Sequence, residues 1–467
     1  MTRQILPVPN PVLSYWLRDP HAYADLRSSP RLPAECDVVV VGAGLAGVLA
    51  AYHILTTTDE IDEEGDGTEA QDGVGGGFER GKTKVMLIDA RQLCSGATAR
   101  NGGHVKVQVK TLLNLENGEK DGGKKRTEFQ DYVTRVMHEL KRIAEQEELD
   151  CEFELRRSFD VFTDAQEAED IHHRYETARK RGEGWTTNVS WIGAQMVEQV
   201  TSISGAKGAF SVPAASFWPY KFVMQLLERM VARWPHRLNI QMNTPVTRLT
   251  TTSSDTTILV TDRGSLTAAK IVLATNAYTA GLLPSFTHAV IPVRGMASHH
   301  TPKHPIHPHL ANTYNIAFGP QKGVDYLNPR PDGSIVVGGG AWLFGGDMHS
   351  WRGNWDDAHL FSEEVMRYWH EYMADRFLGW GNSGAVNDSA WTGIMGRTVD
   401  GQPFVVRVPG RENIWVLAGF NGGGMAIIAL CAKAVGKMVV QGKGFGEVWE
   451  EEGLLECFGA TEGRMGI

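Results

Sequence analysis

The first regular feature in the pattern of apolar positions is a short valine-rich run, Cys36 to Val41, with the composition of a strand buried on both faces. It breaks into the small residues Gly42 to Gly47, and a helical period then runs from about Leu45 to Leu55. A second apolar run, Lys84 to Ile88, lies further along the chain and ends on Asp89. The pattern predicts a βαβ unit.

Two polar, glycine-rich stretches interrupt this pattern, and neither has enough apolar side chains to pack. We expect residues 56–84 to form a mobile surface insertion between the helix and the second strand, and residues 117–126 to form another insertion. The βαβ unit tolerates the first one because the entropy of loop closure grows slowly with length. The two insertions could cover a pocket or decorate the surface, and both roles stay open.

Helical and strand-like periods alternate along the rest of the chain. Helices are predicted at about Phe129–Glu148, Ala165–Arg181, Tyr220–Trp234 and Met425–Gln441. Strands are predicted at Phe159–Phe162, Leu238–Gln241, Ile258–Val260, Lys270–Ala274, Ser334–Gly338 and Ile414–Leu417.

The glycines at positions 42, 44 and 47 have the spacing of a dinucleotide-binding turn. In such a turn the first glycine allows the tight bend, the second lets backbone approach a pyrophosphate, and the third lets the helix pack on the strand. The phosphates then face the helix N-terminus, whose free N–H groups and dipole favour anions. The candidate cofactor contacts in this turn are Gly42, Ala43, Gly44, Leu45, Ala46 and Gly47.

Asp89 ends the second strand of the unit. We expect its carboxylate to accept hydrogen bonds from an adenosine ribose, with a turn-capping aspartate as the alternative. Ala90, Arg91 and Val246 are further candidate cofactor contacts. This pattern alone does not separate NAD from FAD.

The segment after Asp89 reads Cys94-Ser95-Gly96-Ala97-Thr98-Ala99-Arg100-Asn101-Gly102-Gly103-His104. It resembles the D-amino-acid oxidase superfamily of flavoenzymes, in particular the branch with γ-glutamylputrescine oxidase, glycine oxidase and sarcosine oxidase. Small residues let main chain run against pyrophosphate and flavin, where bulky side chains would collide. The resemblance implies FAD contacts from Ser95, Gly96, Ala97, Thr98, Arg100, Asn101, Gly102, Gly103 and His104.

The resemblance continues in order over most of the chain, from about Cys36 to Val440. It covers Thr275–Tyr278 with Ile291–Gly295, then Trp391–Gly396 with Thr398, Asp400 and Pro403, and finally Ala418–Met425. In the last segment a glycine turn opens a helix onto the flavin. The family pattern implies further cofactor contacts from Thr275, Asn276, Gly393, Gly422, Gly423, Gly424 and Met425.

Three departures from the family pattern change the expected ligands. Gly423 stands where many relatives have histidine, and Ala426 where sarcosine oxidase-like members have a carboxylate-binding lysine, so a small acidic amine substrate loses support. Some relatives attach the flavin to a cysteine just before the Pro-Asp turn, where this chain has Asp325-Tyr326-Leu327. We therefore predict non-covalent FAD.

The resemblance implies hydride transfer from a C–H bond beside an amine nitrogen to flavin, followed by hydrolysis of the imine. The expected partners are a small amine or amino-acid-like substrate and oxygen, which would be released as peroxide. Such chemistry asks mainly for orientation in a dry pocket. The alternatives are a dehydrogenase with another electron acceptor, a flavin-binding redox sensor or scaffold without turnover, and an NAD enzyme.

The candidate catalytic residues are His104, Arg294, Tyr326 and Trp391, and Trp342 is a further candidate for the pocket wall. His104 could carry a proton or activate oxygen as a cation, or be a structural donor. Arg294 could approach the ring or bind an acidic group, or form a structural salt bridge. The aromatic residues could face an amine or belong to the core. For five histidines we expect an exposed loop and no metal: His299, His300, His304, His307 and His309.

Composition narrows the class of protein. The 467 residues include 55 acidic and 46 basic side chains, a net charge of -9 without a basic block, so no nucleic-acid partner is expected. The five scattered cysteines predict reduced thiols and no structural disulfide. Met1 to Pro33 lacks the features of a secretory signal, no stretch reaches the roughly 20 apolar residues of a membrane span, and Arg464–Ile467 is not a peroxisomal address. We expect a soluble cytoplasmic protein; the sequence does not define its oligomeric state.

These observations together predict an α/β fold, a Rossmann-like FAD-binding domain with an inserted α+β substrate domain that carries a mixed sheet. Residues 1–33 form an N-terminal extension. The FAD-binding domain comprises 34–115, 201–284 and 386–467, and the substrate domain comprises 127–200 and 285–385. Ligand and flavin should meet where the two domains face each other.

Overall fold

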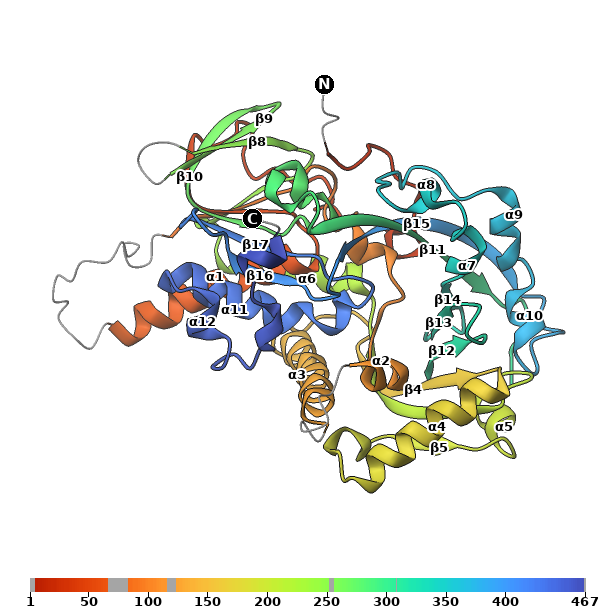
Figure 1. Cartoon of the computed structure of the whole chain (residues 1–467). Coiled ribbons are helices and arrows are strands. Elements are labelled where there is room, and N and C mark those ends of the chain that lie inside the picture. Colours follow the sequence, from red (N-terminus) through yellow and green to blue (C-terminus); the bar gives the residue numbers. More distant parts are fainter. Residues whose placement is uncertain (1–4, 66–82, 116–122, 252–255, 308, 466–467) are drawn as a thin grey trace.

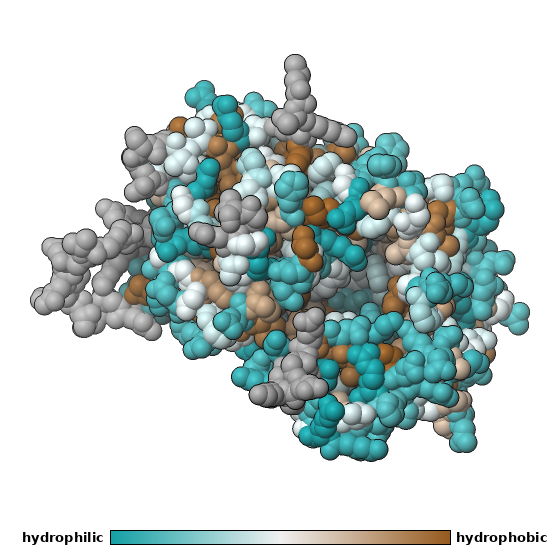
Figure 2. Space-filling model, viewed as in Figure 1, coloured by the Kyte–Doolittle hydropathy of each residue, from teal (hydrophilic) through white to brown (hydrophobic). Residues whose placement is uncertain are grey.

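The computed structural model describes residues 5–65, 83–115, 123–251, 256–307 and 309–465. The chain forms two lobes, each built on one β-sheet (Figure 1). Surface side chains are mainly polar, and the surface is hollowed between the two lobes (Figure 2).

The first sheet has eight strands, and its centre is the predicted βαβ unit. The strands are β1 Glu35–Val41, β2 Val85–Ile88, β7 Leu238–Gln241, β8 Val246–Thr251, β9 Thr257–Thr261, β10 Gly264–Leu273, β16 Phe404–Arg407 and β17 Ile414–Ala418. Their order is β16-β17-β10-β1-β2-β7, with β9 beside β10 and β8 beside β9. The four pairs from β17 to β7 are parallel, which explains why Val38 to Val41 of the central strand are buried on both faces.

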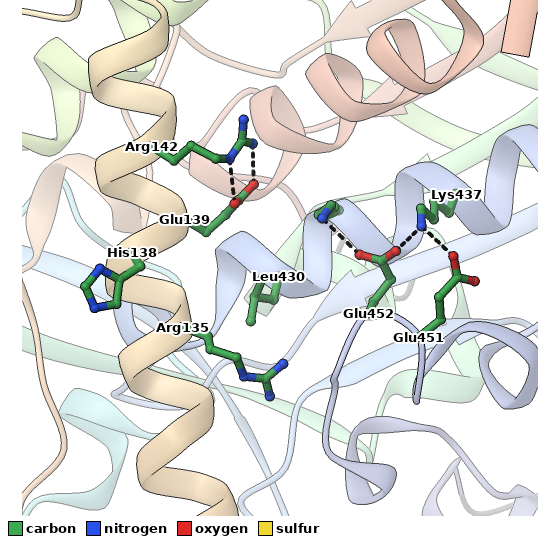
Figure 3. A pocket seen from close by; sticks show the side chains of 9 residues that line it. Arg135, His138, Glu139, Arg142, Leu430, Lys437, Glu451 and Glu452 are labelled. Carbon is green, nitrogen blue, oxygen red and sulfur yellow. Dashed lines mark hydrogen bonds and ion pairs between the residues drawn. The ribbon is translucent and has the colours of Figure 1, made fainter. Parts of the chain in front are cut away.

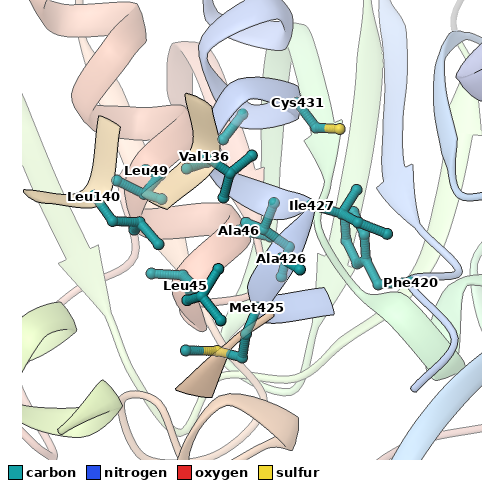
Figure 4. Packing of buried hydrophobic residues seen from close by; sticks show 14 of the residues in the cluster. Leu45, Ala46, Leu49, Val136, Leu140, Phe420, Met425, Ala426, Ile427 and Cys431 are labelled. Carbon is teal, nitrogen blue, oxygen red and sulfur yellow. The ribbon is translucent and has the colours of Figure 1, made fainter. Parts of the chain in front are cut away.

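Helices α1 Leu45–Gly65, α3 Lys124–Gln146 and α11 Ile428–Gln441 pack together beside this sheet (Figure 4). Leu45 and Leu49 of α1 meet Val136 and Leu140 of α3 in one hydrophobic cluster, which Met425 also joins. A fourth helix, α6 Pro219–Arg233, contacts α1. The helix of the βαβ unit is therefore held by segments that are distant in sequence.

Helix α1 runs ten residues further than predicted, so Thr56–Gly65 is helix and not mobile insertion. The prediction was wrong there because the threonine hydroxyls are satisfied inside the helix: Thr56 Oγ1 donates to Tyr52 O at 3.1 Å and Thr58 Oγ1 to Ile54 O at 2.7 Å. Likewise 124–126, expected to end the second insertion, begin α3. The remaining parts of the expected insertions, 66–82 and 117–122, lie outside the described residues.

The second sheet has nine strands. They are β3 His104–Val105, β4 Glu154–Phe162, β5 Ser190–Ile192, β6 Gly208–Ser216, β11 Val290–Thr301, β12 Thr313–Ala317, β13 Val324–Pro329, β14 Ile335–Gly338 and β15 Val386–Thr398. Their order is β15-β11-β14-β13-β12-β4-β6-β3, with β5 beside β6. Only β4 and β12 pair in parallel along this order, so the sheet is mixed, as predicted.

The domain segments expected from sequence differ from this arrangement in three places. Strands β3, β6 and β15 fall in segments assigned to the FAD-binding domain, yet they hydrogen-bond in the second sheet. These strands belong to the second sheet because their hydrogen bonding there is extensive. Strand β6 pairs with β4 over the whole of Gly208–Ser216, and β15 pairs with β11 along almost its full length.

The two faces of the second sheet have different chemistry, because side chains alternate between faces along each strand. On one face Phe159, Tyr314, Leu327 and Val337 lie side by side across four strands and belong to an aromatic-rich core. On the other face, which we call the polar face, the neighbouring row runs Asp160, Asn315, Tyr326, Gly338, Ala297 and Trp391. The polar face shares its buried apolar residues with α1, α3 and α11, so it is turned toward the first lobe.

The other helices are short, apart from α4. They are α2 Val109–Asn114, α4 Ala165–Lys180, α5 Val197–Thr201, α7 Ala341–Phe344, α8 Met348–Trp351, α9 Glu363–Met366, α10 Tyr372–Arg376, α12 Phe445–Val448 and α13 Glu462–Met465. The predicted last helix starts as a turn at Gly424–Ala426, and α11 follows from Ile428. Among the described residues, no helix combines the length and apolarity that crossing a membrane requires.

Candidate functional site

The glycine turn between β1 and α1 is sterically closed at two of its three glycines. Gly42 has φ +108°, and a Cβ there would lie 2.5 Å from Ala274 O. A Cβ on Gly47 would lie 1.7 Å from Gly42 O, so the helix packs directly on the turn. A Cβ on Gly44 would lie 3.0 Å from Thr98 Oγ1. The turn needs glycine at 42 and 47 for its own backbone, whatever it binds.

Two amides of this turn donate to side chains, and Gly42 N donates to Ile88 O at 2.8 Å. Ala43 N donates to Asp89 Oδ2 at 2.7 Å, and Leu45 N donates to Thr98 Oγ1 at 3.0 Å. The second Asp89 oxygen accepts from Arg91 N at 2.8 Å, and burial raises the pKa of this carboxyl. Asp89 therefore caps the turn, which is the alternative role expected for it from sequence. Its carboxylate oxygens keep lone pairs that a ribose could use.

The segment from Ala97 to His104 follows as a tight turn whose carbonyl groups are bound from behind. Arg100 O accepts from Trp391 Nε1 at 3.0 Å, Gly102 O from Asn328 Nδ2 at 2.8 Å, and Gly103 O from Phe217 N at 3.0 Å. In a trans peptide the N–H points away from the preceding C=O. The N–H groups that follow these carbonyls therefore point to the opposite side of the turn.

The side chains of Arg91 and Arg100 do not face the glycine turn. Both approach the buried carboxylate of Asp357, at 2.9 Å from Arg91 Nη1 and 3.4 Å from Arg100 Nε. Arg100 also donates to Ser95 O at 3.0 Å and Thr392 O at 2.6 Å. Burial lowers the pKa of Arg100 to about 10, against the opposing effect of Asp357. Asp357 was not singled out from sequence, because nothing in its neighbourhood has a regular pattern. The backbone of Arg91 is bound as well, since its N donates to Asp89 Oδ1 and its O accepts from Asn243 N, so Arg91 offers no free amide to a cofactor.

His104 and Tyr326 meet at the start of the polar face. Their rings lie edge to face with centroids 5.2 Å apart, and a Cβ on Gly102 would come within 2.7 Å of the Tyr326 ring and 2.8 Å of the His104 ring. Nδ1 of His104 is buried without a hydrogen-bond partner among the described residues. Burial, helped by the nearby Lys106 ammonium, holds the pKa of His104 well below its usual range. This disfavours the cationic role and leaves a neutral imidazole.

The closing glycine turn lies next to Asn276. Asn276 Oδ1 accepts from Gly419 N at 3.0 Å, and Thr275 Oγ1 lies 2.9 Å from Thr279 Oγ1. Gly422 and Gly423 are exposed, and a Cβ on either would meet nothing within 4 Å. The open space at Gly423 shows that the site has no steric need for glycine where many relatives carry histidine.

The remaining candidates are mostly held by structural contacts. Arg294 donates to His359 O and lies over the Phe361 ring at 4.4 Å, contacts that favour the structural alternative. Trp391 is fully buried, and Trp342 is half-buried, 5.4 Å from the Phe318 ring. Val246 has its side chain in the core of the first lobe, so any cofactor contact there would come from backbone. Gly393 lies against Arg100, where a Cβ would stand 3.0 Å from Arg100 Cβ.

Sequence reasoning also missed Lys106, which lies one residue beyond the end of β3. Its ammonium donates to Ser158 Oγ at 3.0 Å and Tyr314 O at 2.6 Å. Burial lowers its pKa to about 7, with Asp160 opposing the shift. The polar face thus carries a buried amine, a buried carboxyl and a phenol, although no motif marks them.

The five histidines do not behave as one loop. His299 and His300 lie in β11 and are buried, which corrects the expectation of an exposed loop for these two. They follow the strand because β11 continues past a bulge between them. His304, His307 and His309 are exposed. The described residues contain no group of three side chains that could hold a metal ion.

A separate cavity of about 510 Å³ lies between α3 and α11 (Figure 3). Most of its charged side chains are paired with one another: Glu139 with Arg142 at 2.6 Å, Lys437 with Glu451 at 2.8 Å. Lys433 likewise meets Glu452 at 3.3 Å. None of the candidate site residues lines this cavity, so it is not the site assembled above.

Comparison with known proteins defines the class. Residues 37–438 match the FAD dependent oxidoreductase family DAO, and the chain belongs to this family. The probable oxidoreductase OrdL of Rhizobium meliloti (strain 1021) is 22% identical over 409 residues, which cover 87% of this chain and 83% of OrdL. The putative Rieske 2Fe-2S iron-sulfur protein YhfW of Bacillus subtilis (strain 168) is 23% identical over 223 residues. That match covers 47% of this chain and 36% of YhfW, about a third of its length.

Solved structures show the same fold. Glycine oxidase from Geobacillus kaustophilus has a TM-score of 0.65 at 17% identity, covering 88% of this chain and 95% of the oxidase. L-proline dehydrogenase from P.horikoshii has a TM-score of 0.62 at 17% identity, with the same coverage of both chains. The predicted fold class and the family resemblance are therefore confirmed.

FAD is the cofactor of this family, and the described residues fit it. Glycine or small residues line both turns, and a Cβ on Gly96, Gly422 or Gly423 would enter open space. The carbonyls of Arg100, Gly102 and Gly103 are all turned away to protein donors. Backbone of Gly42–Gly47, Ala97–Gly103 and Gly422–Met425 would hold FAD.

Proposed function

We propose that this protein oxidises a C–N bond of an amine or amino-acid derivative, with oxygen as electron acceptor, as a cytoplasmic flavoenzyme with non-covalent FAD. The observation that carries the proposal is the polar face next to the Gly102 turn, where His104 and Tyr326 are wedged against backbone without room for a side chain at 102. Bound FAD supplies the hydride acceptor.

The protein residues have the task of orientation and exclusion of water. A neutral His104 can accept a hydrogen bond from a substrate N–H without competing as a cation for the same place. Tyr326 is half-buried, and burial raises the pKa of its phenol, so it stays a hydrogen-bond donor. Substrate would lose a hydride from carbon to the flavin and a proton from nitrogen to solvent, and water then hydrolyses the imine to a carbonyl compound and an amine. Oxygen would take up the two electrons and two protons as hydrogen peroxide.

The names of the structural neighbours support this substrate class without deciding it. They include glycine oxidase, L-amino acid deaminase and iminodiacetate oxidase, but also L-α-glycerophosphate oxidase, which by name acts on a compound without an amine. L-proline dehydrogenase is in the same group, so a dehydrogenase with another electron acceptor is the second candidate.

The experiment uses the purified flavoprotein under anaerobic conditions. A panel of primary and secondary amines and both enantiomers of the amino acids is added, and bleaching of the visible flavin band is followed by admission of air. The proposal expects bleaching by at least one panel member and rapid return of the colour with formation of peroxide. Bleaching without reoxidation by air would favour the dehydrogenase, and a panel with no bleaching would favour a flavin-binding protein without turnover.

A further inference from the structure

The N-terminal segment Ile5–Pro33, which we call the strap, precedes β1 and lies outside the region that matches the family. It contains a single short 3-10 turn, Tyr15–Leu17. Even so, Ser14, Tyr15 and Trp16 are at most 4% exposed. An irregular segment with buried aromatic and polar side chains must have specific partners.

Its partners are the two carbonyl groups of the Ala97–Gly103 turn for which no donor has been described above. Ser14 Oγ donates to Ala99 O at 2.5 Å, and Trp16 Nε1 donates to Asn101 O at 2.7 Å. Together with the bonds to Arg100, Gly102 and Gly103, five successive carbonyls of the turn are therefore bound from behind. The strap supplies two of the five donors and so sets two of the peptide planes.

The backbone of Val12 in the strap also binds residues of the candidate site, as acceptor and as donor. Arg100 Nη2 donates to Val12 O at 2.7 Å, and Val12 N donates to Asp357 O at 2.8 Å. A Cβ on Gly103 would stand 2.7 Å from the Trp16 ring, which covers the back of the turn. The strap thus covers the side of the turn to which the carbonyls of Ala99 and Asn101 point.

Further contacts tie the strap to the second lobe. The Tyr15 ring stacks on the His299 ring with centroids 3.9 Å apart, and Arg18 pairs with Asp388 at 2.8 Å. The Arg330 guanidinium lies 5.0 Å from the centre of the Trp16 ring. The strap therefore joins the Ala97–Gly103 turn to β11 and β15 of the second sheet.

We infer that the strap is part of the cofactor site: Ser14 and Trp16 are positioning residues that orient the Ala97–Gly103 turn, and FAD retention depends on them. The inference concerns binding of FAD and not the choice of substrate or acceptor. It stands independently of the proposed reaction, because flavin binding is measured without turnover.

The test measures the FAD dissociation constant by equilibrium fluorescence titration of stripped enzyme, with thermal unfolding in parallel. Ser14→Ala removes one hydrogen bond with little change in shape, and Trp16→Phe removes the indole N–H together with part of the ring. Each should raise the dissociation constant about fivefold, with about 25-fold for the double variant. The matched control is Trp234→Phe, because Trp234 is also a buried tryptophan and its Nε1 donates to Asp59 Oδ2 at 2.8 Å, away from the turn.

The control should lose thermal stability but keep the wild-type dissociation constant for FAD. Equal FAD affinity in the double variant and in Trp234→Phe would overturn the inference. If the double variant does not fold, Ser14→Ala alone decides, since it removes a single oxygen atom; an unchanged dissociation constant in that variant has the same meaning.

Discussion

The imidazole of His104 meets the phenol ring of Tyr326 edge to face, with centroids 5.2 Å apart, and both rings press on the backbone of Gly102. This packing leaves no water around Nδ1 of His104 and explains why burial is the main cause of its lowered pKa. The two rings lie where the Ala97–Gly103 turn meets the polar face. The charge of His104 therefore bears directly on the chemistry of the site.

A neutral His104 predicts a flavin spectrum without a histidine titration. The visible absorbance of the bound flavin should show no step with a midpoint near about pH 6.5, the ordinary value for histidine. The measurement is a spectral titration from about pH 6 to 8, with His104→Gln as comparison. A step in the wild type that disappears in His104→Gln would show that His104 is charged in this range.

Removing the carboxylate that serves Arg91 and Arg100 should be costly. Asp357→Asn leaves two buried guanidinium groups without a counter-charge, and we expect a loss of about 3–5 kcal/mol in the free energy of unfolding. The matched control is Glu176→Gln, which breaks a pair with Arg179 that is 56% exposed and should change the free energy of unfolding far less, because water screens the pair. Urea unfolding measures both. A similar small loss in both variants would mean that the cluster does not act as a buried ion pair.

Gly47→Ala should prevent formation of the dinucleotide turn. The added methyl group would stand 1.7 Å from Gly42 O, a clash with backbone that only a shift of α1 can relieve. We expect at least about 3 kcal/mol of destabilisation and loss of bound flavin. Gly446→Ala in α12 is the control, because its Cβ meets nothing within 4 Å and alanine should stabilise that helix slightly. A yellow, stable Gly47→Ala protein would contradict the steric argument.

Because His53 is buried, we expect the free energy of unfolding to fall in acid. Burial lowers its pKa to about 3, so between about pH 6.5 and 3 the unfolded chain binds a proton that the folded state refuses. The free energy of unfolding should therefore be independent of this group above about pH 6.5 and fall by up to about 1.4 kcal/mol for each pH unit below it.

The measurement is urea unfolding of the wild type and of His53→Gln at about pH 7, 6 and 5. His53→Gln should flatten the pH dependence by the slope of one group. Parallel curves for wild type and His53→Gln would show that His53 does not contribute.

Non-covalent attachment of FAD predicts that acid releases the colour. Tyr326 and Leu327 lie in β13, before the turn at Pro331–Gly333, and Leu327 belongs to the aromatic-rich core. Precipitation with trichloroacetic acid should leave all flavin in the supernatant, measured by absorbance. A fluorescent protein band after denaturing electrophoresis would contradict the prediction.

The parts of the site that sequence predicts well are those with a local mechanical cause. The turn at Gly42 to Gly47 is recognisable because Gly42 has φ +108° and Gly47 packs on Gly42 O, which are both local causes, and Asp89 because it ends the neighbouring strand. The predicted strands Leu238–Gln241 and Ile414–Leu417 correspond to β7 and β17, since fully buried strands have a distinct composition.

What sequence does not predict depends on partners that are distant in the chain. Asp357 acquires its role only from two arginines more than 250 positions away, and Ser14 only from a carbonyl 85 positions away. The serine and the two aromatic residues at 14–16 were the available signal within a proline-rich segment. The length of α1 was missed because its threonines are paired with their own helix.

Side chains alternate between the two faces of the second sheet, so substitutions on one face are independent of substitutions on the other. Residues such as Asn315 and Tyr326 can be exchanged on the side turned to the first lobe without touching the layer that contains Tyr314 and Leu327 on the reverse side. Homologous enzymes can in this way acquire new specificities at alternate positions of the same strands while the supporting half of the sheet stays as it is.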